Sequence, residues 1–359
     1  MEYILSQLDK VAEEVKGLEE KRRMLGQFLR EIKGVEIDSK EVLERKISFP
    51  VKRFDLKSAK IIGVDGGLVR QAYHAIDLIL TRSVGVAFIF KDGKLDKVDY
   101  YPNAFPSPQL TVISDSHSLQ DLMLAANLER QQSEVKMLTE MGNLGGDLVL
   151  ADGSIVPHPM DRPKNTSPLF RRYEKLLELY RELYSTKSLL AGVNEDSRSK
   201  RVTDILAESI LEQIKDTRVE NLSSILKSTR DSNLLFHVLK EGERSFVFRY
   251  SEESQIIKDL GSMAKNVYSF YLKTTSFDRP IRVDFYSEKE PVRDADKIAA
   301  LLLPISSHNQ EYGFPTVLVE ADSKARLREE ELDVVHSYIV DKVGSISALY
   351  KLRRDSRPF

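Results

Sequence analysis

The sequence predicts an α/β fold, with a mixed sheet, flanking helices and an N-terminal helical arm. Three observations predict it: apolar residues recur at helical spacing near the N-terminus, short β-branched strands alternate with helical segments along the rest of the chain, and two of these strands run directly into Asp-Gly turns. No low-complexity linker and no internal repeat divides the chain. We therefore expect a helical arm over residues 1–35 and a single domain over residues 36–359.

The composition excludes several classes of protein. The chain has 359 residues, with 54 Lys and Arg, 56 Asp and Glu, and no Cys. The absence of Cys excludes disulfides, thiolate-bound metal sites and thiol nucleophiles, and it favours an intracellular, reducing compartment. Because no apolar run approaches about 20 residues and the N-terminus lacks the pattern of a signal peptide, we expect a cytoplasmic protein with no membrane contact. The net charge of −2 gives no global attraction to DNA, so a DNA contact would need locally gathered basic residues.

The first helix is expected to carry a seam of apolar side chains. Steps of four and three residues alternate along it, interrupted only at Arg22, and this spacing is typical of heptads. The seam has two interpretations, a coiled-coil contact with another chain or an amphipathic helix packed on its own domain. In both, Gly34 ends the helix and a polar connection over residues 36–60 follows. The seam consists of Ile4, Leu8, Val11, Val15, Leu18, Leu25, Leu29 and Ile32.

Two short apolar strands are predicted to end on an Asp residue. Residues 61–64 form the first strand, which stops at the turn signal Asp65-Gly66-Gly67. Residues 147–151 form the second strand, which stops at Asp152-Gly153-Ser154. Either Asp-Gly pair alone is mostly a turn signal. Their shared ending nevertheless places two carboxylates at strand ends.

Between these strands the sequence predicts a hairpin and a helix. The hairpin joins the β-rich segments 84–90 and 95–101 through an Asp-Gly turn. The helix spans residues 118–141 with apolar residues at helical spacing, and it carries Glu129 and Glu134. Beyond the second strand, helices and strands remain interleaved. Strand, antiparallel hairpin, helix and strand is the order of a ribonuclease H-like nuclease core.

The predicted core gathers carboxylates. Asp65 and Asp152 lie side by side if their strands are neighbours in the sheet, and a Glu on the covering helix can reach the same point. Clustered carboxylates repel one another unless cations are present. Oxygen-rich sites suit Mg²⁺ or Mn²⁺, and a pair of such ions serves phosphodiester hydrolysis. The ordered combination, more than any single residue, predicts a metal-dependent nuclease.

These segments resemble the NurA nuclease family of archaea and some bacteria. The resemblance implies a ribonuclease H-like fold and a manganese-dependent deoxyribonuclease, with Mg²⁺ as a second possible cofactor, that acts as a 5′–3′ exonuclease and a single-strand endonuclease. It also implies a homodimer that works with a hexameric HerA translocase in DNA end resection and double-strand break repair, alongside Mre11–Rad50. The resemblance rests on IIGVDGG at 61–67, the helix around Glu129, DLVLADGSI at 147–155, AGVNEDSRS at 191–199 and YGFPTVLVEAD at 312–322.

By this resemblance, the metal-binding Asp positions of the family fall on Asp65 and Asp152. The helix Glu falls on Glu129, with Glu134 as the runner-up because helix and loop lengths can shift the match. Asp322 stands where the family commonly has a His, and a fourth carboxylate still serves Mg²⁺ or Mn²⁺. The same replacement also allows a second interpretation, an inactive scaffold subunit that guides DNA and docks on the translocase. The predicted catalytic and metal-binding set is Asp65, Glu129, Asp152 and Asp322.

A basic segment follows the apolar residues at the start of the resembling segment 191–199. Arg198, Lys200 and Arg201 suit contacts with DNA phosphates. In the alternative interpretation, Asp196 caps the next helix and the basic side chains are solvated. The sequence does not separate DNA from RNA as the substrate. It has no His-Glu-x-x-His helix and no phosphate-binding P-loop, which excludes a zincin and predicts that any motor activity comes from a partner.

Overall fold

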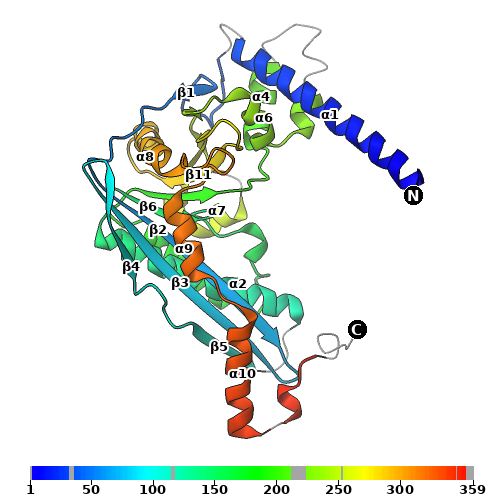
Figure 1. The fold of residues 1–359 in the computed structure, drawn as a ribbon, viewed down its shortest axis with the longest axis vertical. Helices are drawn as coiled ribbons and strands as arrows, with labels where there is room; N and C mark the ends of the chain where they lie inside the picture. Colours follow the sequence, from blue (N-terminus) through cyan, green and yellow to red (C-terminus); the bar gives the residue numbers. More distant parts are fainter. Residues whose placement is uncertain are drawn as a thin grey trace. The chain divides into compact units, whose positions relative to one another are not determined.

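The computed structural model describes residues 2–31, 36–114, 118–211, 224–251, 254–344 and 346–352. The described chain forms two compact units (Figure 1). The predicted helix end at Gly34 and the predicted boundary at residue 35 lie outside the described residues, so the division into an arm and one domain stays a prediction. No helix among the described residues is both long and apolar enough to cross a membrane. The first unit comprises Met1–Phe54, Val193–Tyr250 and Val267–Pro315, and the second comprises Asp55–Gly192, Ser251–Asn266 and Thr316–Phe359.

The first unit contains antiparallel strands and the N-terminal helix. Its strands lie in the order β1-β8-β10-β11, and β9 pairs with β10. The helices α1, α4 and α6 share an apolar core with these strands. The elements are α1 (Glu2–Glu31), β1 (Ser48–Pro50), α4 (Arg201–Leu211), α6 (Asp231–Val238), β8 (Glu243–Ser245), β9 (Phe248–Arg249), β10 (Val267–Leu272), β11 (Ile281–Tyr286) and α8 (Pro291–Ser306).

Helix α1 divides its apolar seam between two environments. Near its C-terminal end, Leu25 and Leu29 are only 1% and 4% exposed, because they pack into the core of the first unit. Nearer the N-terminus, Leu8, Val11 and Val15 are more than half exposed. The interpretation as a helix packed on its own domain therefore holds for the C-terminal half of the seam. The N-terminal half has no such cover within the described residues of this single chain.

The second unit contains a mixed sheet with helices packed against it. The strand order is β6-β2-β3-β4 and β5 also pairs with β3; β6 runs parallel to β2, and the other pairs are antiparallel. The order β2, β3–β4 hairpin, α2 and β6 is the one predicted, which confirms the fold class. The elements are β2 (Ser58–Ala72), β3 (Ile76–Lys91), β4 (Lys94–Tyr101), β5 (Gln109–Ser114), α2 (Leu119–Leu144), β6 (Leu148–Asp152), η1 (Pro159–Asp161), α3 (Phe170–Leu183), α7 (Gln255–Leu260), η2 (Ser262–Asn266), α9 (Thr316–Ala325), α10 (Glu329–Val343) and η3 (Ser347–Leu349), while β7 (Leu190–Asn194) begins in this unit and ends in the first.

Strand β2 does not stop at Asp65, which corrects the prediction of a strand end there. It continues through the glycines and pairs with β3 as far as Ala72. Its glycines allow other backbone to approach: a Cβ at Gly63 would lie 2.9 Å from the carbonyl oxygen of Val317, and one at Gly67 would collide with the carbonyl oxygen of Ala325, both in α9. The glycines that resemble a turn therefore make room for a helix that crosses the strand (Figure 1).

Two local predictions are confirmed near the site. The β3–β4 hairpin turns at Asp92 and Gly93, whose φ angles of 50° and 77° match the turn type that Asp-Gly favours. Helix α2 begins after Ser118, whose side chain accepts a hydrogen bond from the backbone of Asp121, and it ends before Gly145. These local signals thus set the ends of the β3–β4 hairpin and of α2, and both β3 and α2 contact β2.

Candidate metal centre

Two of the predicted ligands occupy adjacent positions on neighbouring strands. The parallel register between β2 and β6 pairs Val64 with Ala151, and the next residue on each strand is Asp65 and Asp152. Strand β6 ends at Asp152, as predicted, while β2 continues. Register-matched residues on parallel strands lie on the same face of a sheet. The sheet itself therefore holds these two carboxylates together.

Glu134 reaches β2 from helix α2, on the strand face opposite to the one that α9 covers. A Cβ added at Gly66 would lie 2.5 Å from Cγ of Glu134, so the carboxylate side chain lies directly against the strand. The Glu134 side chain is 13% exposed and forms an ion pair with Arg130, one turn earlier in α2. Glu134 is therefore a largely buried carboxylate next to Asp65, with an arginine of its own helix as its counter-ion.

Electrostatic coupling connects these groups with Asp322. Burial raises the pKa of Asp65, and the charge of Asp322 raises it further. Burial raises the pKa of Glu134 to about 8, and the charges of Asp65 and Asp152 add to this effect while Arg130 opposes it. Repulsion between these carboxylates thus adds to the effect of burial at this site. We call Asp65, Glu134, Asp152 and Asp322 the carboxylate quartet.

Asp322 is partly open to solvent. It lies in α9, its side chain is 48% exposed, and it forms an ion pair of 3.0 Å with Arg326 one turn later. Asp65 and the two glycines that face α9 alternate along β2, at positions 63, 65 and 67, which places Asp65 on the face that α9 covers. The helix that carries Asp322 therefore covers the Asp65 side chain.

Glu129 lies elsewhere on α2. It forms an ion pair of 2.5 Å with Arg172 of α3. Five residues separate Glu129 from Glu134, so the two side chains point in directions about 140° apart around the helix. The geometry favours the runner-up, Glu134, and the assignment of Glu129 stays a prediction. Arg130, which lies between them, was not among the predicted site residues.

The donor atoms of the carboxylate quartet fit a divalent cation. All are carboxylate oxygens, the ligand type that Mg²⁺ and Mn²⁺ prefer. Burial, and to a smaller extent the neighbouring carboxylates, raise the pKa values of Asp65 and Glu134, and a bound cation would oppose this effect. Within the described parts of the chain, no three His, Asp or Glu side chains are arranged as a ready-made metal site. One carboxylate, Glu134, is instead turned to Arg130.

The predicted DNA-contacting residues lie in the first unit, and two of the three are engaged internally. Lys200 Nζ donates a 2.7 Å hydrogen bond to the carbonyl of Lys227, and Arg201 forms an ion pair with Glu41. Arg198 is exposed, and no hydrogen bond or ion pair joins its side chain to another described residue. A contact between these residues and DNA stays a prediction.

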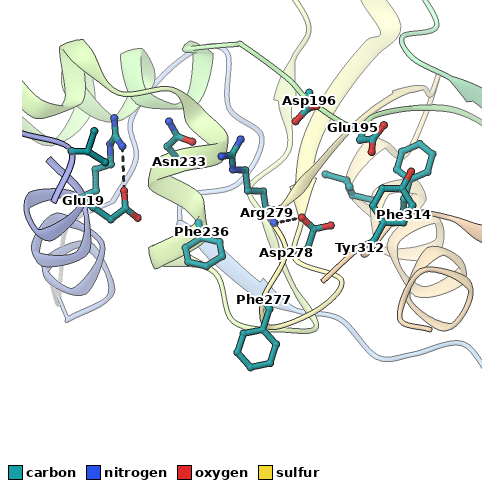
Figure 2. A pocket seen from close by; sticks show the side chains of 13 residues that line it. Glu19, Glu195, Asp196, Asn233, Phe236, Phe277, Asp278, Arg279, Tyr312 and Phe314 are labelled. Carbon is teal, nitrogen blue, oxygen red and sulfur yellow. Dashed lines mark hydrogen bonds and ion pairs between the residues drawn. The ribbon is translucent and has the colours of Figure 1, made fainter. Parts of the chain in front are cut away.

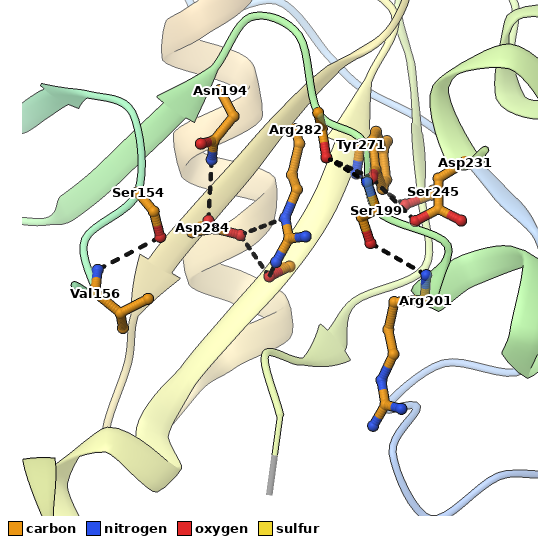
Figure 3. Close-up of polar contacts among 12 residues, drawn as sticks. Ser154, Val156, Asn194, Ser199, Arg201, Asp231, Ser245, Tyr271, Arg282 and Asp284 are labelled. Atoms are coloured by element: carbon orange, nitrogen blue, oxygen red, sulfur yellow. Dashed lines mark hydrogen bonds and ion pairs between the residues drawn. The ribbon is translucent and has the colours of Figure 1, made fainter. Parts of the chain in front are cut away.

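The cap expected from Asp196 is supplied by other residues. The amide of Arg201 donates to the Ser199 hydroxyl at 3.1 Å (Figure 3). The amide of Thr203 donates to Asp231 at 2.9 Å. Asp196 is exposed and lies five residues before α4. The alternative interpretation was right that this segment starts a helix, but wrong about the capping side chain.

The segment around Asn194 also belongs to a buried polar network. Asn194 donates to Asp284 at 3.0 Å, and Asp284 also accepts hydrogen bonds from Ser269 at 2.6 Å and from Arg282 at 2.7 Å (Figure 3). Asp284 is 1% exposed. This part of the resembling segment therefore stabilises the first unit.

The aromatic residues of the last resembling segment line a separate cavity of the first unit. This cavity has a volume of about 610 Å³ and is lined by residues of α1, α6 and the β10–β11 connection (Figure 2). The rings of Tyr312 and Phe314 lie 6.0 Å apart at its wall, and Phe314 is buried. Four acidic side chains also line the cavity: Glu19, Glu195, Asp196 and Asp278.

Comparison with known proteins agrees with this architecture. The NurA nuclease from Sulfolobus solfataricus has a similar fold, with a TM-score of 0.57 at 15% identity, over 96% of this chain and 98% of that chain. A structure of NurA bound to dAMP and manganese has a TM-score of 0.53 at 11% identity, over 97% of this chain and 98% of that one. No curated protein matches the sequence significantly. The NurA domain model matches residues 59–327, a range that contains the whole carboxylate quartet and most of the chain, and on this match the chain belongs to the NurA family.

Proposed function

We propose that this protein is a metal-dependent DNA nuclease that hydrolyses phosphodiester bonds, with the carboxylate quartet as its ligands for Mn²⁺ or Mg²⁺. The observation that carries the proposal is the electrostatic coupling of Asp65 with Asp322, and of Glu134 with Asp65 and Asp152, around the point where β2 and β6 place two Asp residues side by side. Membership of the NurA family supports it. The solved NurA structures that contain manganese support the choice of metal.

The members of the carboxylate quartet would have different roles, because their surroundings differ. A bound cation supplies an activated water and neutralises charge on the phosphate. Asp65 and Asp152 present oxygens whose spacing the sheet fixes. Glu134 is largely buried, so water competes little with it for a cation. The partly exposed Asp322 keeps one ligand on the side from which water and substrate enter.

We also propose the finer activities and partners that the family relationship supports. These are 5′–3′ exonuclease and single-strand endonuclease activity, cooperation with a HerA-type hexameric translocase in DNA end resection, a functional link to Mre11–Rad50, and an intracellular location. Of the three predicted DNA-contacting residues, the exposed Arg198 is the one best suited to contact phosphate, because Lys200 and Arg201 already have partners. Such a contact would be independent of sequence and sensitive to salt.

We propose that the exposed half of the α1 seam joins two copies of the chain or docks the translocase. Replacing Leu8, Val11 and Val15 with Ser should lower the oligomer mass or abolish translocase binding, because these exposed side chains add little to the stability of one chain. Light scattering and pull-down assays would measure this. As a control, Leu25→Ala should cost about 2 to 5 kcal/mol of unfolding free energy, because Leu25 is in the core. Unchanged mass and unchanged partner binding in the triple variant would refute the proposal.

Cleavage of end-labelled DNA tests the main proposal. Single- and double-stranded substrates would be incubated with Mn²⁺, Mg²⁺ or EDTA, with the wild type beside Asp65→Asn and Asp152→Asn. We expect metal-dependent cleavage in the wild type and a loss of at least about 1,000-fold in each variant, because each removes a charged ligand oxygen from the site. Cleavage that survives either substitution would show that the site is assigned wrongly.

A scaffold without catalytic activity is the second candidate, and the ion pair between Arg130 and Glu134 favours it. In a scaffold, this arginine would neutralise the site permanently. Thermal unfolding with and without Mn²⁺ separates the two candidates, because a cation that binds only the folded nuclease must stabilise it. A scaffold should show no Mn²⁺-dependent shift, and no cleavage even with the translocase present.

A further inference from the structure

Arg130 lies beside two members of the carboxylate quartet, Glu134 and Asp65. Its guanidinium bonds to Glu134, and the charge of Asp65 also acts on it. The side chain is about one third exposed, at 33%. The other arginine beside the quartet, Arg326, is 67% exposed, so solvent screens its pairing with Asp322. The charge of Arg130 therefore acts more strongly on the site than that of Arg326.

The order of the pair along α2 does not favour a role in helix stability. In an i,i+4 pair, the acidic residue is better placed N-terminal to the basic one, and here Arg130 precedes Glu134. The pair lies against β2, where the glycine at position 66 leaves the space that the Glu134 carboxylate fills. The arrangement is explained by the need to neutralise a buried carboxylate beside Asp65 and Asp152.

We propose that Arg130 is the internal counter-ion of the carboxylate quartet, which a divalent cation must displace from Glu134, so that Arg130 sets the metal affinity of the site. This inference rests on the proposed metal-binding function. One carboxylate oxygen cannot be held fully by the guanidinium and by a metal ion at once. A positive charge this close also repels an incoming cation. Arg130 is thus a positioning residue, and removing its charge favours the metal.

The chain offers a matched control on the same helix. Glu129 forms an equivalent ion pair with Arg172, whose side chain is 35% exposed, close to the value for Arg130. If Glu129 were the metal ligand, Arg172 would play the role that we assign to Arg130. The two arginines therefore distinguish the two possible ligands as well as testing the counter-ion role.

Calorimetric titration of the full chain with Mn²⁺, in oxygen-free buffer at a pH above the value of about 8 to which burial raises the pKa of Glu134, tests the inference without an activity assay. We expect Arg130→Gln to bind Mn²⁺ about tenfold more tightly than the wild type, Arg130→Lys to stay within about twofold, and Arg172→Gln to be unchanged. If Arg130→Gln unfolds without metal, refolding on addition of Mn²⁺ supports the same conclusion. In that case, the Mn²⁺ affinity of Arg130→Lys, which keeps the charge, would be compared with that of the wild type.

The possible failures differ in meaning. Unchanged or weaker Mn²⁺ binding in Arg130→Gln would overturn the counter-ion role and leave the proposed nuclease intact. Tighter binding in Arg172→Gln, with no change in Arg130→Gln, would overturn it and identify Glu129 as the ligand. No Mn²⁺ binding by any of the proteins, the wild type included, would refute the metal site itself.

Discussion

The two units each bury an acidic group, but they neutralise it differently. In the first unit, Asp284 has an ion pair with Arg282 and hydrogen bonds from Ser269 and Asn194. In the second, the carboxylate quartet has one partly buried arginine, and the pKa values of Asp65 and Glu134 are raised. Burying a charge is costly unless it is paired and hydrogen-bonded. A single buried carboxylate with these partners therefore indicates a structural role, whereas several coupled carboxylates with raised pKa values indicate a place that a cation would stabilise.

Matched Asp-to-Asn substitutions in the two units should show the largest difference in unfolding free energy. Asp284→Asn should cost about 3 to 5 kcal/mol of unfolding free energy, because it leaves Arg282 buried without its counter-charge. Without metal, Asp152→Asn should cost less than about 1 kcal/mol or even stabilise, because it removes one of several repelling charges. Urea unfolding would measure both. Equal losses would contradict the distinction between the two sites.

The pH dependence of stability should sharpen the same contrast. The folded chain keeps a proton on Glu134 up to about pH 8, whereas the unfolded chain loses it near 4.5. The stability from this group is fully present below 4.5 and is lost as pH rises through 8, with a slope of up to about 1.4 kcal/mol per pH unit, or about 2 kcal/mol between pH 6 and 8. Urea unfolding across this range without metal would measure the slope.

Glu134→Gln is the control for that measurement. The variant should lose most of the slope, and the smaller part that stays should come from Asp65, whose pKa is also raised. Mn²⁺ should flatten the wild-type curve, because a metal ligand must be deprotonated. If Glu134→Gln has the same slope as the wild type, Glu134 does not cause the slope.

Replacing one glycine of β2 should disturb the site with a smaller effect. Gly66→Ala places a methyl group against Glu134, so the carboxylate must shift. We expect cleavage to fall roughly 10- to 100-fold, because misplacing a ligand by about 1 Å has costs of that size. Gly17→Ala, in an open part of α1, is the control and should change nothing. Full activity in Gly66→Ala would show that the position of Glu134 against the strand does not matter.

The sequence predicted the parts of this site that depend on local signals. The end of β6 at Asp152, the Asp-Gly hairpin and the start of α2 near Ser118 are each encoded within a few residues. Asp65 was placed correctly next to Asp152, although on a strand wrongly expected to end. The two glycines after Asp65 have the sequence of a turn, and only the tertiary structure reveals that they accommodate α9 and Glu134.

The choice between Glu129 and Glu134 needed tertiary information for another reason. Helix α2 contacts β2, β3 and α3, so its buried residues are distributed around the helix without forming one stripe. The apolar periodicity therefore could not identify which Glu faces the strand. Arg130 was missed because an arginine in a helix is usually solvated, and nothing in the sequence marks this one as partly buried.

Direct counting of bound Mn²⁺ tests the central claim that the carboxylate quartet forms a metal site. Electron paramagnetic resonance, in which free Mn²⁺ gives a signal that binding removes, would be applied to the wild type, Asp152→Asn and Asp284→Asn under conditions where all three are folded. We predict that the wild type and Asp284→Asn bind Mn²⁺ equally, and that Asp152→Asn loses most of this binding. Equal binding by Asp152→Asn and the wild type, or no binding by the wild type, would contradict the account.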